Sequence, residues 1–207
     1  MPRRSVWGVS VGAKTKSAFG VEARGFAMPP PPAETSTTTF DEMVQIGRMV
    51  GDLTNAQIFR IRHEDRIDVE TLFVEVLEQY GFQVGPKILK RLAAIREEVF
   101  GVAEQYQGRF QRMTPRQWRV KHGRKTPLPP CQTEPTYAYP SKHATVGAFL
   151  ARYLGEKFPR AKPTLDEYGR QVGWNRVRAG WHWASDYAMG RQLAEHLWKH
   201  FDEKGLT

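Results

Sequence analysis

Apolar residues recur every three or four positions in successive segments of this chain, and no segment of useful length alternates between apolar and polar residues. The first spacing places apolar side chains on one face of an α-helix, whereas a half-buried strand requires alternation. The longest such segment follows Pro86, a residue that is favoured in the first turn of a helix. Its apolar positions are Ile88, Leu92, Ile95, Val99 and Val102. The pattern therefore predicts an all-α protein, a single-domain helical bundle.

Local signals predict several helix ends and one loop. Thr54 and Gln57 have the spacing of a capping box, and Thr164 and Glu167 have the same spacing before the next helical pattern. The stretch 113–139 is rich in proline, which is typical of loops. We therefore expect helices to begin at both threonines and the stretch 113–139 to be a long irregular loop.

The N-terminal residues differ in composition from the rest of the chain. Pro29–Pro32 favours an extended conformation, and the Thr35–Thr39 run that follows is typical of a solvated linker. We expect an extended arm over residues 1–39 and a helical domain over residues 40–207. Arg3 and Arg4 precede a short apolar run that contains glycine and serine, so this arm resembles only a weak export signal.

Composition limits the classes of function. With 207 residues, of which 40% are hydrophobic, the chain can bury one sizeable core. The single cysteine, Cys131, excludes an intramolecular disulfide and gives no metal-binding spacing. No stretch approaches the ~18 apolar residues of a membrane-spanning helix, so we do not expect an integral membrane protein. The formal net charge of +9 favours anionic partners, and phosphoesters, nucleic acids and anionic membranes fit it equally well.

The segment from Arg176 to Asp186 carries a set of side chains suited to phosphoryl transfer. His182 and Asp186 are four residues apart, so they lie on the same side of a helix. A carboxylate beside an imidazole can fix one tautomer, which leaves the other ring nitrogen free to attack phosphorus. The guanidinium of Arg176 suits two phosphoryl oxygens at once. We assign His182 as nucleophile, Asp186 as its orienting group and Arg176 as a phosphate ligand.

A second segment, Pro140–His143, would complete the site. Ser141 precedes an apolar-periodic run and reads as a helix N-cap, where unpaired backbone N–H groups favour an anion. His143 in the first turn could protonate the leaving oxygen as a general acid. Taken singly, these residues also have structural interpretations. His182 could be a packed histidine, Arg176 and Asp186 could form a structural ion pair, and Arg112 could simply be exposed.

These residues resemble motifs of the class A bacterial acid phosphatases, in the type 2 phosphatidic acid phosphatase and vanadium haloperoxidase superfamily. Its third block, S-R-x5-H-x3-D, is matched by Arg176, His182 and Asp186, with Asn175 in place of the serine. Its second block, P-S-G-H, is matched by Pro140–His143, with lysine in place of the glycine. The resemblance runs from about Pro29 to the C-terminal helix. It implies a helical bundle of the acid phosphatase and haloperoxidase type.

The first block, K-x6-R-P, is altered. The alignment puts Gln107 at the lysine position and Thr114 at the arginine position, so two positive charges near the phosphate are missing. Loss of one preorganised donor typically costs roughly 10²–10³ in turnover. If Lys142 compensates, Lys142→Gly should lower activity, and if it obstructs the site, the same change should raise it. The candidates to supply the missing charge are Lys142, Arg109 and Arg112, beside Ser141 and Arg176 as phosphate ligands.

The resemblance implies a metal-independent acid phosphatase that hydrolyses small phosphomonoesters through a phosphohistidine on His182. It implies no cofactor and no metal, requires no nucleic acid, and is compatible with a homo-oligomer. It also implies a periplasmic location, with a cytoplasmic one as the alternative because the export signal is weak. Two other functions remain open. One is a phosphate-binding homologue with weakened catalysis, and the other is a vanadate-dependent haloperoxidase, against which the chain length counts.

Overall fold

The computed structural model describes residues 26–129 and 134–201. Within these ranges every regular element is a helix, which confirms the predicted all-α fold. The helices are α1 (Thr37–Gly51), α2 (Asn55–Glu64), α3 (Val69–Gln79), α4 (Pro86–Phe110), α5 (Pro115–Lys121), α6 (Lys142–Lys157), the short 3-10 helix η1 (Pro159–Ala161), α7 (Lys162–Arg178) and α8 (Ala184–Lys199).

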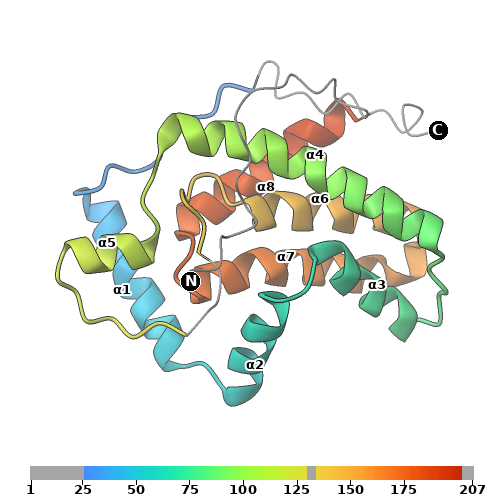
Figure 1. Ribbon diagram of the computed structural model, residues 1–207, viewed down its shortest axis with the longest axis horizontal. Coiled ribbons are helices and arrows are strands. Elements are labelled where there is room, and N and C mark those ends of the chain that lie inside the picture. The colour runs from blue at the N-terminus through green and yellow to red at the C-terminus, as the bar shows by residue number, and fades with distance from the viewer. Residues whose placement is uncertain (1–25, 130–133, 202–207) are drawn as a thin grey trace, which may run out of the picture.

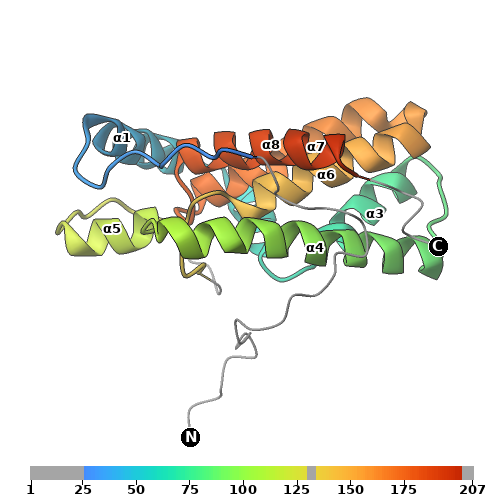
Figure 2. The same ribbon diagram turned by 90° about the horizontal axis from the view of Figure 1, so that it is seen from above.

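Helix α6 occupies the centre of the bundle. It packs most extensively against α7, then against α8 and α4. Figures 1 and 2 show the long helix α4 along one side of α6, with α7 and α8 on its other sides. Fully buried side chains of α3, α4, α6 and α8 form the main core between these helices. Examples, one from each helix, are Phe73, Leu92, Phe149 and Leu193.

A smaller apolar cluster lies at the end of the bundle formed by α1 and α5. Trp118 of α5 and Trp183 are both about 1% exposed and meet edge to face with their ring centroids 5.8 Å apart. Met43 and Ile46 of α1 belong to the same cluster. This cluster fixes α1 and α5 against the connection between α7 and α8, where the candidate site lies.

Three of the predicted helix starts are confirmed and one is wrong. Ser141 is the N-cap of α6, as predicted. Pro86 begins α4, and Thr54 and Gln57 form a complete capping box at the start of α2. Thr164, in contrast, lies inside α7, which begins at Lys162 directly after η1. The 3-10 turn already supplies the entry into this helix, so no threonine cap is needed.

The loop prediction for residues 113–139 is wrong in its first part, because α5 occupies Pro115–Lys121. Thr114 is the N-cap of α5 and forms a capping box with Gln117, while Pro115 sits in the first turn. Proline is tolerated there because the first N–H groups of a helix have no partner within the helix.

The segment before α1 lies against the helical domain. The Phe26 carbonyl accepts a hydrogen bond from the Tyr106 hydroxyl, and the Pro29 carbonyl accepts one from the Tyr139 hydroxyl. Helix α1 itself begins at Thr37, three positions before the boundary expected from composition. None of the helices in residues 26–129 and 134–201 combines the length and apolar composition needed to cross a bilayer.

Candidate active site

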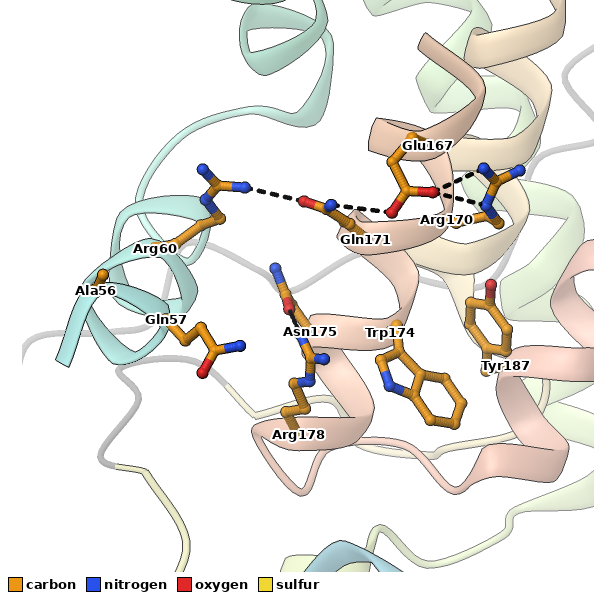
Figure 3. Close-up of a pocket in the computed structure, with 10 residues that line it drawn as sticks. All are labelled: Ala56, Gln57, Arg60, Glu167, Arg170, Gln171, Trp174, Asn175, Arg178 and Tyr187. Carbon is orange, nitrogen blue, oxygen red and sulfur yellow. Dashed lines mark hydrogen bonds and ion pairs between the residues drawn. The ribbon is translucent and has the colours of Figure 1, made fainter. Parts of the chain in front are cut away.

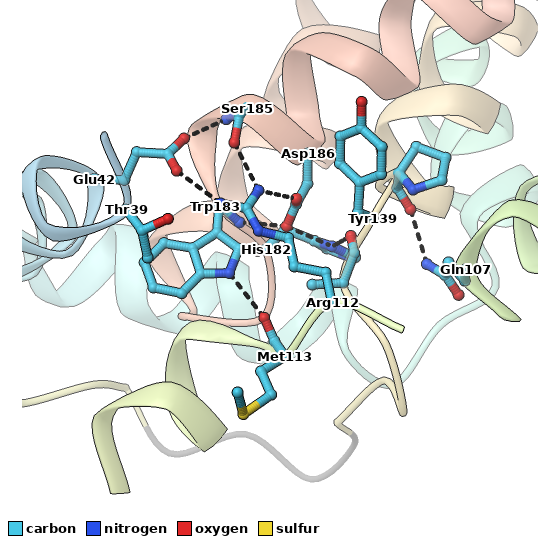
Figure 4. A network of polar contacts seen from close by, with 12 residues as sticks. Thr39, Glu42, Gln107, Arg112, Met113, Tyr139, His182, Trp183, Ser185 and Asp186 are labelled. Atoms are coloured by element: carbon cyan, nitrogen blue, oxygen red, sulfur yellow. Dashed lines mark hydrogen bonds and ion pairs between the residues drawn. The ribbon is translucent and has the colours of Figure 1, made fainter. Parts of the chain in front are cut away.

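Three segments that are distant in sequence meet at one end of α6. The turn after α4 meets the loop before α6 where the Ala138 amide donates to the Arg112 carbonyl at 2.8 Å. That loop meets α8 where the Ser141 amide donates to the Asp186 carbonyl at 3.0 Å. Figure 4 shows the side chains that converge here. The structure therefore brings together the three blocks that the sequence singled out.

Glycines allow α7 and α8 to approach the start of α6 closely. A β-carbon on Gly173 of α7 would lie 2.7 Å from the Cα atom of Ala144, and one on Gly190 of α8 would lie 2.6 Å from the Ser141 carbonyl oxygen. Both distances are too short for any residue with a side chain. The close approach brings the C-terminal end of α7 beside the first turn of α6.

His182 precedes α8, and its ring is buried with one nitrogen fixed. Nδ1 lies 2.7 Å from the Ala138 carbonyl oxygen and 3.8 Å from Oδ2 of Asp186. A carbonyl can only accept, so the proton is on Nδ1 and the lone pair is on Nε2. The tautomer that an attacking imidazole needs is thus fixed chiefly by a backbone carbonyl, a group that sequence reasoning did not identify.

Asp186 lies in the first turn of α8 and is fully buried. Its Oδ2 accepts the backbone N–H of Trp183 at 2.7 Å, and its Oδ1 accepts Nη1 of Arg112 at 2.5 Å. A carboxylate at a helix N-terminus also interacts favourably with the helix dipole. Asp186 therefore shapes the turn that carries His182, in addition to lying near the His182 ring.

Arg112 is buried among protein acceptors. Besides Asp186, it donates to Oε2 of Glu42 at 3.0 Å and to the Ser185 hydroxyl at 2.7 Å, and its guanidinium lies 5.1 Å from the centre of the Trp183 ring. The alternative interpretation, that Arg112 is simply exposed, is therefore wrong. The structure assigns its hydrogen bonds to the protein rather than to a phosphate.

Glu42 was missed by the sequence analysis. It comes from α1, where it is buried, and its Oε1 also accepts the backbone N–H of Ser185 at 2.6 Å. The available signal was its position directly before Met43, on the apolar face of α1. An acidic residue on a buried face requires a charged or hydrogen-bonding partner.

Arg176 is 1% exposed at the C-terminal end of α7 and pairs with α2. Its Nη2 donates to the Glu64 carbonyl oxygen at 2.7 Å and lies 3.9 Å from Oε2 of the same residue. Asn175 donates to both carboxylate oxygens of Glu64 at 3.0 Å. Burial raises the pKa of Glu64, and the charge of Arg176 opposes this shift. The buried carboxylate beside Arg176 is thus Glu64, whereas Asp186 pairs with Arg112.

His143 lies in the first turn of α6, partly buried and edge-on to the Phe100 ring at 5.5 Å between centroids. Burial lowers the pKa of His143 well below 6.5, and the positive charge of Arg176 lowers it further, as does that of His182 when its ring is protonated. The His143 ring is therefore neutral at pH 7.

The remaining candidate phosphate ligands, Ser141, Lys142 and Arg109, contact other parts of the protein. Ser141 is the buried N-cap of α6, and its hydroxyl accepts the Ala144 N–H at 3.3 Å. Lys142 forms an ion pair with Glu104 of α4 at 2.5 Å, with its ammonium 5.2 Å from the centre of the Phe100 ring. Arg109 is exposed and lies against the ring of Phe110. Lys142 thus reaches toward α4, the helix that carries Arg109.

The two substituted positions of the first block are used structurally. Gln107 is buried and its Nε2 donates to the Pro140 carbonyl at 2.8 Å, which joins α4 to the loop before α6. The Thr114 hydroxyl donates to Glu134 at 2.7 Å and caps α5.

Among residues 26–129 and 134–201, no cluster of three or more His, Cys, Asp or Glu side chains is arranged to hold a metal ion.

Comparison with known proteins supports a family assignment. The PAP2 superfamily model matches residues 105–201, a range that includes all three blocks. The non-specific acid phosphatase of Salmonella typhimurium is 39% identical over 56 residues, which cover 27% of this chain and 22% of that protein. The aligned region thus spans about a fifth of the relative.

Among solved structures, the fold resembles the first transmembrane PAP2 type phosphatidylglycerolphosphate phosphatase from Bacillus subtilis. The TM-score is 0.51 at 12% identity, over 80% of this chain and 87% of that one. At this identity the likeness concerns the fold alone. The three blocks, the family match over residues 105–201 and the all-α fold agree with one another, and together they support assignment to the PAP2 superfamily.

Proposed function

We propose that this protein is a metal-independent phosphatase that hydrolyses phosphomonoesters through a phosphohistidine on His182. The observation that carries the proposal is the 2.7 Å hydrogen bond from Nδ1 of His182 to the Ala138 carbonyl, which leaves the lone pair on Nε2. A periplasmic location and small phosphomonoester substrates, as in the acid phosphatases that the chain resembles, are part of the proposal.

In the first step, Nε2 of His182 attacks phosphorus, and the bond from phosphorus to the leaving oxygen breaks. Protonated His143 gives its proton to that oxygen, so the alcohol leaves neutral. The Asp186 carboxylate, 3.8 Å from Nδ1, stabilises the positive charge that develops on the ring. In the second step, water attacks phosphorus, His143 takes a proton from this water, and the nitrogen–phosphorus bond breaks.

The lowered pKa of His143 links this mechanism to pH. The protonated form that must donate is scarce at neutral pH, because burial and nearby positive charge disfavour it. Its population increases as the pH falls toward the folded-state pKa. We therefore expect turnover to rise on acidification below neutrality, which is the behaviour expected of an acid phosphatase.

A second candidate is a phosphate-binding homologue with little turnover, and a specific observation favours it. Gln107 and Thr114 are neutral and hydrogen-bonded within the protein, while Arg112 is paired with carboxylates. These three residues therefore offer little positive charge to the phosphoryl oxygens, and Arg176 is itself paired with Glu64. Since each missing donor typically costs roughly 10²–10³ in turnover, we expect hydrolysis to be slow.

Hydrolysis of p-nitrophenyl phosphate in the presence of a chelator separates the two candidates. We expect the wild-type protein to release p-nitrophenol at the same rate with and without chelator. His182→Ala should lower this rate by at least about 10³-fold, because the nucleophile is lost. His200→Ala is the matched control, since His200 is an exposed histidine at the other end of α8. Equal rates in the wild type and His182→Ala, with phosphate binding retained, would favour the homologue without turnover.

A further inference from the structure

A hollow lies away from His182, between α2, α7 and α8. Its volume is about 500 Å³, and His143, Arg176, His182 and Asp186 do not line it. Figure 3 shows side chains of α2 facing those of α7 across this space. Its lining residues include Arg60, Glu167, Gln171, Trp174, Arg178 and Tyr187. We refer to it as the α2–α7 hollow.

The α2–α7 hollow is lined by more positive than negative charge. Arg170 forms an ion pair with Glu167 at 2.7 Å. Arg60 instead donates to the amide oxygen of Gln171 at 2.9 Å, and Arg178 donates to the amide oxygen of Asn175 at 3.1 Å. An amide oxygen is a neutral acceptor and leaves the positive charge of its partner in place. Two guanidiniums with neutral acceptors therefore attract an anion to this hollow.

These guanidiniums are held by amides that are themselves fixed. The amide nitrogen of Gln171 donates to Glu167 at 2.9 Å, and that of Asn175 donates to the buried carboxylate of Glu64 at 3.0 Å. Each amide thus has its oxygen turned toward an arginine. Side chains that are already ordered lose less conformational entropy when a ligand binds.

Aromatic side chains form another part of the lining. Trp174 and Tyr187 are partly buried, and their ring centroids lie 5.0 Å apart at an angle of 74°. Aromatic rings in protein pockets offer stacking surfaces to planar ligands, a contact worth about 1–3 kcal/mol per base when nucleic acids bind. The hollow thus combines positive charge with an aromatic wall.

We propose that the α2–α7 hollow binds an aromatic phosphoester of nucleotide size. Arg60 and Arg178 attract its phosphate, and its ring packs against Trp174. The volume lies in the range of roughly 300–1,000 Å³ that is usual for small-molecule sites. This site is separate from the phosphatase chemistry at His182, and its occupation does not require turnover.

Calorimetric titration of the His182→Ala protein tests the proposal, because this variant cannot consume the ligand through the proposed mechanism. The probes are adenosine 5′-monophosphate, adenosine and inorganic phosphate, each titrated separately. We expect the nucleotide to bind at least about tenfold more tightly than either fragment, since only the nucleotide uses both the charge and the aromatic wall.

Further substitutions in the His182→Ala protein locate the binding site. Arg60→Gln, Arg178→Gln and Trp174→Leu should each weaken nucleotide binding severalfold. Arg152→Gln is the matched control, because Arg152 is an exposed helical arginine on a different hollow, between α6, α7 and α8, and should leave the affinity unchanged. Arg60 is exposed on α2, so its substitution should leave the fold intact.

Two results would overturn the proposal. One is nucleotide binding that Arg60→Gln and Arg178→Gln leave unchanged, which would place the nucleotide elsewhere. The other is inorganic phosphate that binds as tightly as the nucleotide, which would show an anion site without recognition of the ring. Neither result bears on whether His182 becomes phosphorylated, so the two proposals fail independently.

Discussion

Replacement of Arg112 by methionine should strongly destabilise the protein. Arg112 is the shared partner of two carboxylates, at 2.5 Å from Asp186 and 3.0 Å from Glu42, whose side chains are 0% and 9% exposed. Removing one partner of a buried ion pair typically costs about 3–5 kcal/mol, because the remaining charge is left uncompensated. The contact of Arg112 with the Trp183 ring at 5.1 Å adds about 1 kcal/mol. Methionine fills much of the same volume, so little of the loss comes from a cavity.

Urea unfolding followed by circular dichroism measures this loss. We expect the free energy of unfolding to fall by about 5 kcal/mol, which corresponds to roughly 10–20 °C in Tm for a domain of this size. Arg109→Met is the matched control, because Arg109 is an exposed arginine three residues earlier whose guanidinium lies over the Phe110 ring, and its loss should cost under about 1 kcal/mol. A loss of under about 1 kcal/mol for Arg112→Met as well would refute the assignment of Arg112 to a buried ion-pair network.

Three further predictions concern the residues around the candidate site. The pKa of His143 is lowered below 6.5 in the folded protein. As the pH falls below about 6.5, His143 therefore becomes protonated in the unfolded chain while it stays neutral in the folded protein. The free energy of unfolding should therefore decrease on acidification from pH 7. Urea titrations at each pH should show that His143→Asn removes part of this decrease. If the free energy of unfolding of the variant depends on pH as that of the wild type does, the assignment is wrong. Gln107→Lys restores an ammonium at the altered block, and this ammonium can still donate to the Pro140 carbonyl. We expect kcat/KM for p-nitrophenyl phosphate to rise about 10²-fold. No rise in kcat/KM would count against the alignment. Glu64→Gln removes the negative charge 3.9 Å from Arg176 and keeps an oxygen that can accept from Asn175. We therefore expect KM for p-nitrophenyl phosphate to fall. A higher KM would contradict a role for Arg176 in binding phosphate.

The helical architecture was predictable because its signals are local. Apolar spacing over Ile88 to Val102 gives α4, and the capping box of Thr54 gives the start of α2. The error at α5 came from treating prolines as evidence for a loop, although Pro115 occupies the one part of a helix that accepts proline. Helix entry through a 3-10 turn, as before α7, leaves no recognisable cap in the sequence.

The candidate site was predictable only in part. Spacing and family resemblance identified His182, Asp186 and Arg176, and the structure brings their segments together. The carboxylates that hold the arginines were not predictable, since Glu42 and Glu64 come from α1 and α2, 70 and 112 residues away from the arginines they contact. No local pattern encodes such contacts.

Backbone groups were equally hidden from sequence reasoning. The carbonyl of Ala138 fixes the His182 tautomer, and any residue type could supply that carbonyl. Its position depends on the path of the loop before α6, which the hydrogen bond from the Ala138 amide to the Arg112 carbonyl helps to define. Only the folded chain shows that path.

Trapping of the phosphoenzyme tests the central claim most directly. The wild-type protein is mixed with p-nitrophenyl phosphate, quenched in alkali, where phosphohistidine survives, and mapped by peptide mass spectrometry. We expect one phosphoryl group on His182, absent in His182→Ala and retained in His200→Ala. Release of p-nitrophenol by the wild type with the phosphoryl group on another residue, or on none, would contradict the mechanism.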